Sequence, residues 1–132
     1  PDCPVVVLDE EECWALLAGE ELGRLGYRLV DEIHVVPVNY GLHEGSLVVR
    51  TAAGNKLLAA ELESEVGFEI DGVGSDEAWS VLVRGRLRHL DERRARLVAD
   101  HVPSWVPMLL RYDVLEVVPA TVTGRRFWIS RG

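Results

Sequence analysis

The sequence predicts a mainly β domain of the α+β class: an antiparallel barrel of six or seven strands with two or three short helices outside it. Its segments alternate in hydrophobicity with the period of β-strands, and short turns join them. No long helical crossover, which a parallel sheet would need, lies between them. With 132 residues, 48% of them hydrophobic, the chain can bury one core without disulfides. We therefore predict a single domain over residues 1–132.

The N-terminal half begins with a predicted helix at residues 8–18. Asp9 can cap this helix, acidic residues occupy its first turn, and Gly19 follows its last residue. The segments after it combine alternation with β-branched residues, and their turns contain glycine or acidic residues. We predict strands at residues 23–28, 33–40 and 47–51, of which the first two form a hairpin around residues 31–32.

The C-terminal half is predicted to continue with a helix of about two turns at residues 56–62. The longest strand pattern of the chain follows later, and its interior Gly85 indicates a bulge or a sharp bend. Asp91 can cap another helix, at residues 91–101, and prolines interrupt the loop after it. The predicted strands of this half are residues 66–71, 79–90, 108–118 and 121–129.

Charge and composition exclude several classes of partner. The formal net charge is −8, with 14 Lys and Arg against 22 Asp and Glu, and this sign disfavours a general nucleic-acid binder. No apolar run is long enough to span a bilayer or to form a signal peptide core, so we expect no membrane partner and a cytoplasmic location. A local site for one small anion stays compatible with this charge.

The two cysteines, Cys3 and Cys13, have no second pair and no histidines at zinc-ligand spacing, so we predict no structural metal. They could form one disulfide, but reduced thiols fit a cytoplasmic chain better. The four histidines are scattered without metal spacing. The sequence also contains no nucleophile elbow, phosphate-binding glycine loop or dinucleotide fingerprint, and the catalytic residues stay unknown.

The most suggestive segment runs from the end of the predicted strand at residues 47–51 into the helix that opens at Lys56. Arg50, Thr51, Asn55 and Lys56 place hydrogen-bond donors and positive charge around a turn of small residues. Guanidinium, ammonium and the free N–H groups of a helix start all suit a phosphate group. The alternative reading is an ordinary surface turn with solvated basic side chains. From the residues alone, the two readings have about even weight.

Two further features could build the walls of a ligand site. Pro37 cannot donate to a strand ladder and indicates a sheet edge, where backbone groups around Val38 would be free to meet a flat polar ligand. Trp79 lies near a loop at a strand end, as does Trp128, and flat aromatic ligands favour such side chains. Packing in a core or between subunits is the alternative for both. The sequence also has more apolar strand surface than one small core needs, which a dimer interface would explain.

At these residues the chain resembles the pyridoxamine 5′-phosphate oxidase-like superfamily of FMN-binding split β-barrels, specifically its small actinobacterial flavin-nucleotide-binding members. The resemblance covers most of the chain and rests on the order and spacing of several short motifs. These are Leu16-Leu17, Gly23-Arg24-Leu25-Gly26, Pro37-Val38-Asn39-Tyr40, Val49-Arg50-Thr51, Gly54-Asn55-Lys56 and the stretch from Trp79 to Gly85.

The resemblance implies a homodimer with two equivalent flavin sites at its interface. Arg50, Thr51 and Lys56 would hold the FMN phosphate, with Asn55 beside them. Pro37, Val38 and Asn39 would lie along the isoalloxazine ring. Trp79 and Ser80 would approach the ring as the next strand begins, and the other subunit could contribute them.

The expected activity is that of a flavin-dependent oxidoreductase on an unidentified small molecule. The flavin would supply the redox chemistry, which agrees with the lack of an acid–base motif. Alternatives on the same fold are a deazaflavin-dependent reductase, a non-enzymatic flavin- or haem-binding dimer, and a barrel that has lost its cofactor. The C-terminal arginine and histidine pattern of the vitamin oxidases is not clearly matched by residues 124–128, so pyridoxamine phosphate oxidation is not expected.

Overall fold

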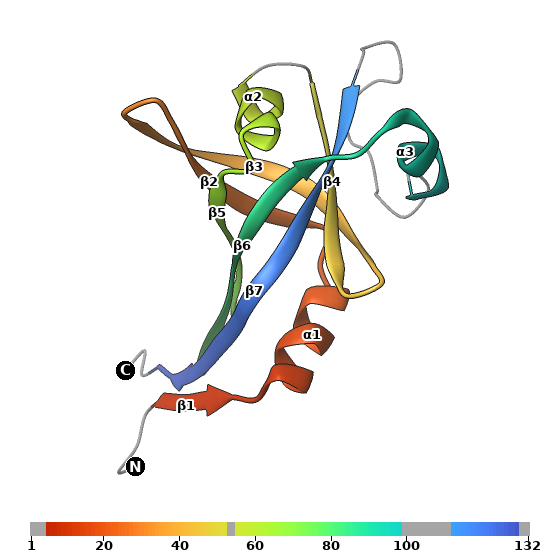
Figure 1. The fold of residues 1–132 in the computed structure, drawn as a ribbon. Coiled ribbons are helices and arrows are strands. Elements are labelled where there is room, and N and C mark those ends of the chain that lie inside the picture. Colours follow the sequence, from red (N-terminus) through yellow and green to blue (C-terminus); the bar gives the residue numbers. More distant parts are fainter. Residues whose placement is uncertain (1–4, 53–54, 99–111, 130–132) are drawn as a thin grey trace.

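A computed structural model describes residues 5–52, 55–98 and 112–129, and within these ranges it contains seven strands and three short helices (Figure 1). The architecture is the predicted antiparallel barrel with helices outside it. Element boundaries follow the sequence-based ones closely, the largest extension being three residues, at the end of β3. The strands are β1 (Val5–Leu8), β2 (Leu22–Leu29), β3 (Glu32–His43), β4 (Ser46–Ala52), β5 (Glu65–Val73), β6 (Glu77–His89) and β7 (Tyr112–Trp128), and the helices are α1 (Glu10–Ala18), α2 (Asn55–Glu61) and α3 (Glu92–Val98).

The seven strands form one antiparallel sheet in the order β1-β7-β4-β3-β2-β5-β6, and a further pairing of β6 with β7 closes it into a barrel. The barrel is split where β3 and β4 separate. Their pairing runs from the hairpin at His43 and Ser46 only as far as Tyr40 and Val49. Beyond that point β3 pairs only with β2, and β4 only with β7. The separation leaves an open strand edge in the wall of the barrel.

Gly85 occupies the predicted bulge, since the register of β6 against β7 shifts between Arg84 and Gly85. A Cβ atom at this position would collide with the carbonyl oxygen of Val118. The close approach of the two backbones therefore requires glycine here, and it bends both strands where the barrel curves.

Two expectations about the strands were wrong. Residues 5–8 were not assigned to a strand, yet they form β1 and pair with residues 124–127 of β7. The two final strands expected at residues 108–118 and 121–129 are one strand of 17 residues, and residues 108–111 lie outside the described ranges. Pro119 does not interrupt it, because this residue stands opposite Gly85 at the bulge, where the ladder is already irregular.

The N-terminal helix α1 has the expected cap. The Oδ1 atom of Asp9 accepts a hydrogen bond from the backbone N–H of Glu12 at 2.8 Å, and the Glu12 carboxylate accepts one from the backbone N–H of Asp9 at 3.3 Å. This reciprocal pair satisfies N–H groups that the first turn cannot pair internally. The Tyr40 hydroxyl donates to the carbonyl oxygen of Leu17 at 2.5 Å and ties the end of α1 to β3.

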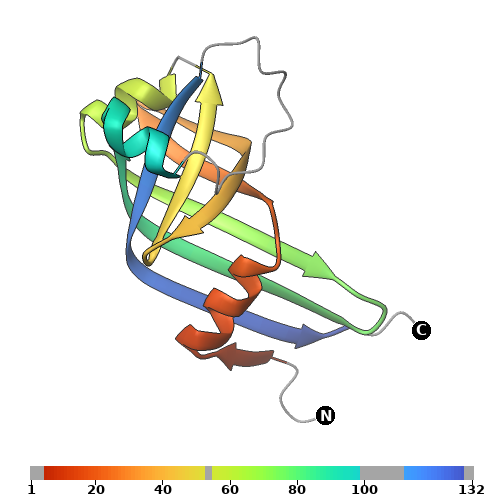
Figure 2. The same cartoon turned by 90° about the vertical axis from the view of Figure 1, so that its right-hand side faces the viewer.

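The main core fills the barrel, and α1 and α2 pack against it at opposite ends (Figures 1 and 2). A second, smaller core lies outside the barrel, where Val48 and Val114 contact Leu90 and Val98 under α3. Both faces of β4 are thus buried within one chain. On β4, the apolar surface that the sequence analysis attributed to a dimer interface is covered by α3 of the same chain. On β3, apolar surface stays exposed, with Ile33 at 70% and Val35 at 67%.

The described part of the chain has no helix with both the length and the hydrophobicity needed to cross a bilayer. It also has no group of three or more side chains suited to hold a metal ion. Cys13 is a free, fully buried thiol, and Cys3 lies outside the described residues. Burial, and next to it the carboxylate of Asp9, raise the pKa of the Cys13 thiol, so this sulfur is a packing group and not a reactive thiolate.

Candidate functional site

The open edge of β3 lies where the sequence placed the ring-binding residues. Tyr40 donates its backbone N–H to Glu21 at 3.1 Å, and in an antiparallel pair such bonds recur at every second residue. The backbone of Val38 therefore faces Gly23 of β2, its register partner. This corrects the expectation that the groups of Val38 itself would be free. It is the backbone of the residues on either side, Pro37 and Asn39, that faces the open edge.

The side chains at this edge differ in burial. Val38 is 4% exposed and belongs to the barrel core, whereas Pro37 is exposed. Asn39 is half-buried, and its Nδ2 atom donates to the carbonyl oxygen of Glu21 at 3.2 Å. The side-chain amide of Asn39 is therefore held next to the start of β2, while its backbone faces the gap between β3 and β4. A flat ligand at this edge would meet backbone polar groups beside an exposed proline ring.

Arg50 and Thr51 lie at the far end of β4, just past the point where β3 departs. They pair with Val114 and Asp113 of β7. Thr51 is a buried polar residue on the face of β4 that fills the barrel, and Arg50 is half-buried on the opposite face with its Nε atom buried. The strand therefore presents these two donors on its two faces.

Lys56 stands in the first turn of α2, and Asn55 is the first residue of this helix. Figure 1 shows α2 at the same end of the barrel as the end of β4. Lys56 is half-buried, and this desolvation lowers the pKa of its ammonium group. Within the described ranges, Lys56 forms no ion pair with a carboxylate. A partly desolvated cation without a nearby acid fits the binding of an anion.

Trp79 and Ser80 do not join this group within one chain. Ser80 is in register with Arg125 of β7, and Arg50 is in register with Val114 of the same strand. Eleven residues separate these two partners, which at about 3.3 Å per residue is on the order of 30 Å. Figure 1 shows the two places at opposite ends of the barrel. Arg50 and Thr51 thus lie on β4 close to the β3 edge, but their side chains point to opposite faces of the strand; Lys56 stands in the helix that follows, and Trp79 and Ser80 are remote.

The two remote residues also differ from each other. The indole of Trp79 packs against the core and covers Gly72, where a Cβ atom would lie 2.5 Å from the ring. Ser80 points to the outer face of the sheet, because its neighbour Val81 points into the core. Trp79 thus has a packing role within the chain, whereas the chain provides no such role for Ser80.

One acidic residue near β4 was missed by the sequence reasoning. Asp113 stands beside Thr51, and its Oδ1 atom is 3.7 Å from Nε2 of His89. Both residues line a cavity of about 310 Å³ that extends under α3. The signal in the sequence was a pair of acids, Asp113 and Glu116, within an otherwise apolar strand. Glu116 is 6% exposed, which is rare for a carboxylate.

The fold and this end of β4 define a class: a small split β-barrel that carries anion-binding side chains beside an open strand edge. A model of the pyridoxamine 5′-phosphate oxidase family matches residues 9–126, and the chain belongs to this family. A candidate pyridoxamine 5′-phosphate oxidase of Corynebacterium glutamicum is 33% identical, with a TM-score of 0.82 over 99% of both chains.

Two further solved structures are similar over nearly their whole length. An FAD-binding protein from Mycobacterium smegmatis is 32% identical, with a TM-score of 0.77, and the match covers 92% of this chain and 99% of that one. An FAD-binding protein from Mesorhizobium loti is 26% identical, with a TM-score of 0.80, covering 94% and 99%. The resemblance found in the sequence motifs is thereby confirmed at the level of the family and the fold.

Proposed function

We propose that the protein is a cytoplasmic homodimer that binds FMN and acts as a flavin-dependent oxidoreductase on a small molecule. Each flavin site would be shared by two copies of the chain. The observation that carries the proposal is the end of β4, where Arg50 and Thr51 stand next to the open edge of β3 and the helix with Lys56 follows. The FAD-binding relatives among the similar structures support a flavin as the ligand.

The residues present fit the phosphate end of a flavin nucleotide. Arg50 can offer two parallel N–H groups to phosphate oxygens, and Lys56 a compact positive charge. The lowered pKa of Lys56 reflects the loss of water around its ammonium group, which a bound dianion would offset. Thr51 would add a hydroxyl donor. These groups suit a phosphate more than a neutral ligand, since burying cations without an anion is unfavourable.

The open edge of β3 fits the ring. An isoalloxazine ring has hydrogen-bond donors and acceptors along its pyrimidine side, and the backbone N–H of Asn39 and the C=O of Pro37 face the gap beyond the last β3–β4 register pair. Pro37 would contact the ring without competing for these hydrogen bonds, because it has no N–H. In this arrangement the protein binds and orients the ring, and the bound flavin would supply the electron-transfer chemistry.

In the proposed dimer, the second copy supplies the Trp79 and Ser80 end of the flavin site. Trp79 and Ser80 are too remote from the Arg50 end of their own chain to contact the same flavin. The outer position of Ser80 fits contact with a partner, and the exposed Ile33 and Val35 provide apolar surface for such an interface. A two-fold dimer would use each chain twice, once for the phosphate and once for the far side of the ring.

The first experiment is an absorption spectrum of the purified protein, followed by titrations with FMN, FAD, a deazaflavin and haem. We expect saturable FMN binding at one site per chain. The double variant Arg50→Ala/Lys56→Ala should weaken it about 100-fold or more, because two charge-assisted contacts are lost. Arg88→Ala removes an exposed arginine elsewhere and is the matched control. Unchanged FMN affinity in the double variant would refute the site.

The other outcomes of these titrations identify the alternatives. Tight binding of the deazaflavin or of haem alone would assign the barrel to that cofactor. Flavin binding without turnover in a screen of reduced nicotinamide donors and small-molecule acceptors would indicate a non-enzymatic flavin carrier. No binding of any of the four would indicate a barrel that has lost its cofactor.

A further inference from the structure

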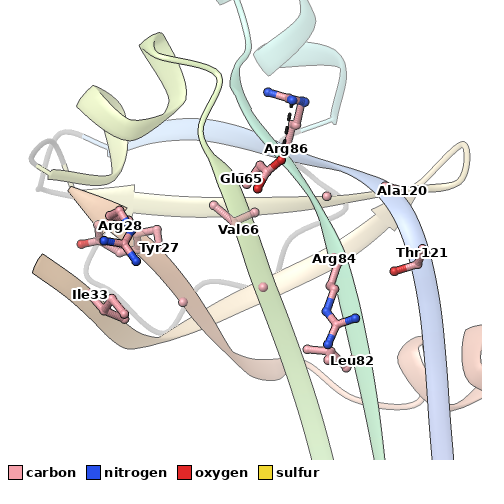
Figure 3. Close-up of a pocket in the computed structure, with 13 residues that line it drawn as sticks. Tyr27, Arg28, Ile33, Glu65, Val66, Leu82, Arg84, Arg86, Ala120 and Thr121 are labelled. Atoms are coloured by element: carbon pink, nitrogen blue, oxygen red, sulfur yellow. Dashed lines mark ion pairs between the residues drawn. The ribbon is translucent and has the colours of Figure 1, made fainter. Parts of the chain in front are cut away.

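The homodimer proposed above would bury the outer face of the sheet formed by β3, β2, β5 and β6. Ile33 and Val35 are exposed on this face, and a hollow of about 630 Å³ lies on it. Figure 3 shows Ile33 and Arg28 on one side of β5 and Arg84 on the other. The hollow leaves room here for side chains of a second copy.

Strand register aligns the two ends of the proposed flavin site on this face. Asn39 of β3 stands opposite Leu22 of β2, and Ser80 of β6 stands opposite Asp71 of β5. The ladder between β2 and β5, continued by two residues, places Leu22 opposite Asp71. Asn39 and Ser80 therefore occupy one row across four strands, about 14 Å apart. They lie at equal distances from the line between β2 and β5.

Two-fold symmetry turns this row into a prediction of how the faces meet. When two copies stack face to face, their two-fold axis lies in the plane between the faces, and each position lies over its mirror position across the axis. An axis along the line between β2 and β5 places the partner's Ser80 over Asn39. The same axis places β2 of one copy over β5 of the other, so that the two members of every β2–β5 register pair change places.

The charges of one register pair fit this exchange. Arg24 of β2 is in register with Glu69 of β5, so Arg24 would lie over the partner's Glu69. Within one chain, the Nη1 atom of Arg24 is 3.0 Å from the Glu69 carboxylate and 3.2 Å from the Asp71 carboxylate. Both contacts use a single nitrogen of the guanidinium group, whose other N–H groups can donate to a carboxylate of a second copy.

Arg28 repeats the pattern at the other end of β2. The ladder between β2 and β5, continued by one residue, places Arg28 opposite Glu65. Among the residues that the structure describes, Arg28 forms no ion pair, and Glu65 has only a long contact of 3.8 Å with Arg86. The exchange would place Arg28 over the partner's Glu65 and so give both groups an additional partner of opposite charge.

The row between these two charged pairs has no side chains. Gly26 and Gly67 are register partners, and a Cβ atom at either would meet other atoms only at 3.7 Å or more, which is ordinary contact. Packing within one chain therefore does not require glycine at either position. In the stacked arrangement Gly26 lies over the partner's Gly67, and the missing side chains leave room for the long arginine side chains of both copies.

The whole face is close to neutral, although the chain carries a net charge of −8. Along the paired stretches of β2, β5 and β6, four arginines point outwards together with three carboxylates. They are Arg24, Arg28, Arg84, Arg86, Glu65, Glu69 and Asp71. Two copies can therefore meet through this face without the repulsion that two strongly acidic surfaces would cause.

We propose that the two-fold axis of the homodimer runs along the outer face between β2 and β5, and that Arg24 of each copy pairs with the partner's Glu69. This arrangement rests on the homodimer proposed above and specifies which surfaces meet. The partner is a second copy of this chain, because base and acid exchange places across the axis.

The test exchanges charges and measures the mass of the particle by light scattering after size-exclusion chromatography, without flavin. We expect the wild-type chain to be dimeric. Arg24→Glu would place carboxylates opposite each other, and Glu69→Arg would do the same with guanidinium groups. Each variant alone should therefore weaken dimerisation about 100-fold or more. An equimolar mixture of the two should form a heterodimer, because every contact across the axis then joins opposite charges.

Recovery in the mixture isolates contacts between chains, since each variant chain keeps its own pair of like charges. Arg93→Glu and Glu11→Arg are the matched controls. They make the same charge changes at exposed residues of α3 and α1, and they should leave the wild-type mass unchanged. The side chains of Arg24 and Glu69 are 51% and 36% exposed, so both variants are expected to fold, which circular dichroism measures.

Two results would overturn this arrangement while the homodimer stands. One is that either variant stays as dimeric as the wild-type chain. The other is that both variants dissociate and their mixture stays monomeric. A monomeric wild-type chain would overturn the homodimer together with the arrangement. Recovery of the heterodimer would support the axis even in a chain that binds no flavin, so failure of the flavin site is distinguishable.

Discussion

The two ends of the barrel differ in how completely one chain builds them. At the α2 end, a strand edge, two cations and a buried hydroxyl lie at the same end of the barrel because they follow one another along β3, β4 and α2. At the other end, Trp79 and Ser80 lie on the far part of β6, next to the hairpin with β5 and to β1 across β7. In the proposed site, the first end would contact the phosphate without help from the partner. The second end has a function in the proposed site only if another chain brings it there.

The largest effect is expected from mixing two defective chains. Arg50→Ala/Lys56→Ala removes the phosphate contacts, and Ser80→Trp blocks the remote end, so neither homodimer should bind FMN. In a mixed dimer, one site would carry both defects and the other none, and FMN binding should return to one site per dimer. Absorption titration of co-expressed, doubly tagged chains measures this stoichiometry. Failure to recover any binding would mean that both ends act within one chain or that Ser80 lies outside the site.

A smaller effect is expected where Gly72 supports Trp79. Gly72→Val places a side chain where the indole lies, and overpacking of this kind costs about 2 kcal/mol of unfolding free energy. We also expect a red shift of tryptophan fluorescence and weaker FMN binding, since the displaced indole would disturb the adjoining Ser80, which we propose contacts the partner's flavin. Gly67→Val on the same strand has room for its side chain and serves as the control for stability. Full FMN affinity in Gly72→Val would remove Trp79 from the proposed site.

The cap of α1 allows a change in stability that should leave the ligand site intact. Asp9→Ala removes the hydrogen bond to Glu12 and should lower the free energy of unfolding by about 1 kcal/mol. Glu11→Ala, in the same turn but outside the cap, should have little effect. Urea denaturation measures both. A loss of FMN affinity in Asp9→Ala would show that α1 couples to the flavin site, contrary to the assignment of that site to the other end.

The smallest effect concerns Lys56, where function and stability are expected to oppose each other. Its lowered pKa means that the charged form is disfavoured in the folded state, so Lys56→Met should slightly stabilise the ligand-free protein while weakening FMN binding. The gain in unfolding free energy of Lys56→Met should be full at pH values below the lowered pKa of Lys56. It should disappear as pH rises towards the ordinary lysine value, because the folded state releases this proton before the unfolded one. Urea denaturation of both proteins between pH 7 and 10.5 tests whether this stability difference falls as pH rises.

Local patterns were sufficient for most of the fold. Alternation and turn residues located β2 to β6, and Gly85 marked the bulge, because these signals act between neighbours in the chain. β1 was missed because four apolar residues become a strand only through pairing with residues 124–127, more than a hundred positions away. The continuity of β7 through Pro119 was missed for the same reason, since Gly85, which stands opposite Pro119, belongs to another strand.

The candidate site was predictable to a similar extent. The motifs that contain Pro37 to Asn39 and Arg50 to Lys56 are close in sequence, and the β3–β4 hairpin holds Asn39 and Arg50 near each other at the point where the strands separate. The distance from Ser80 to Arg50 depends on strand register, which a linear sequence does not contain. The position of Asp113 beside Thr51 is likewise a product of register.

The length of β7 has a consequence for biosynthesis. This strand pairs with β1, β4 and β6, whose residues leave the ribosome well before residues 112–128. Until then, one edge of β4 and of β6 and the whole of β1 lack their hydrogen-bonding partner, and the barrel cannot close. Such long-range closure is slow and leaves strand edges exposed in the nascent chain. Chaperone binding to ribosome-bound chains should therefore persist until β7 emerges and fall sharply afterwards.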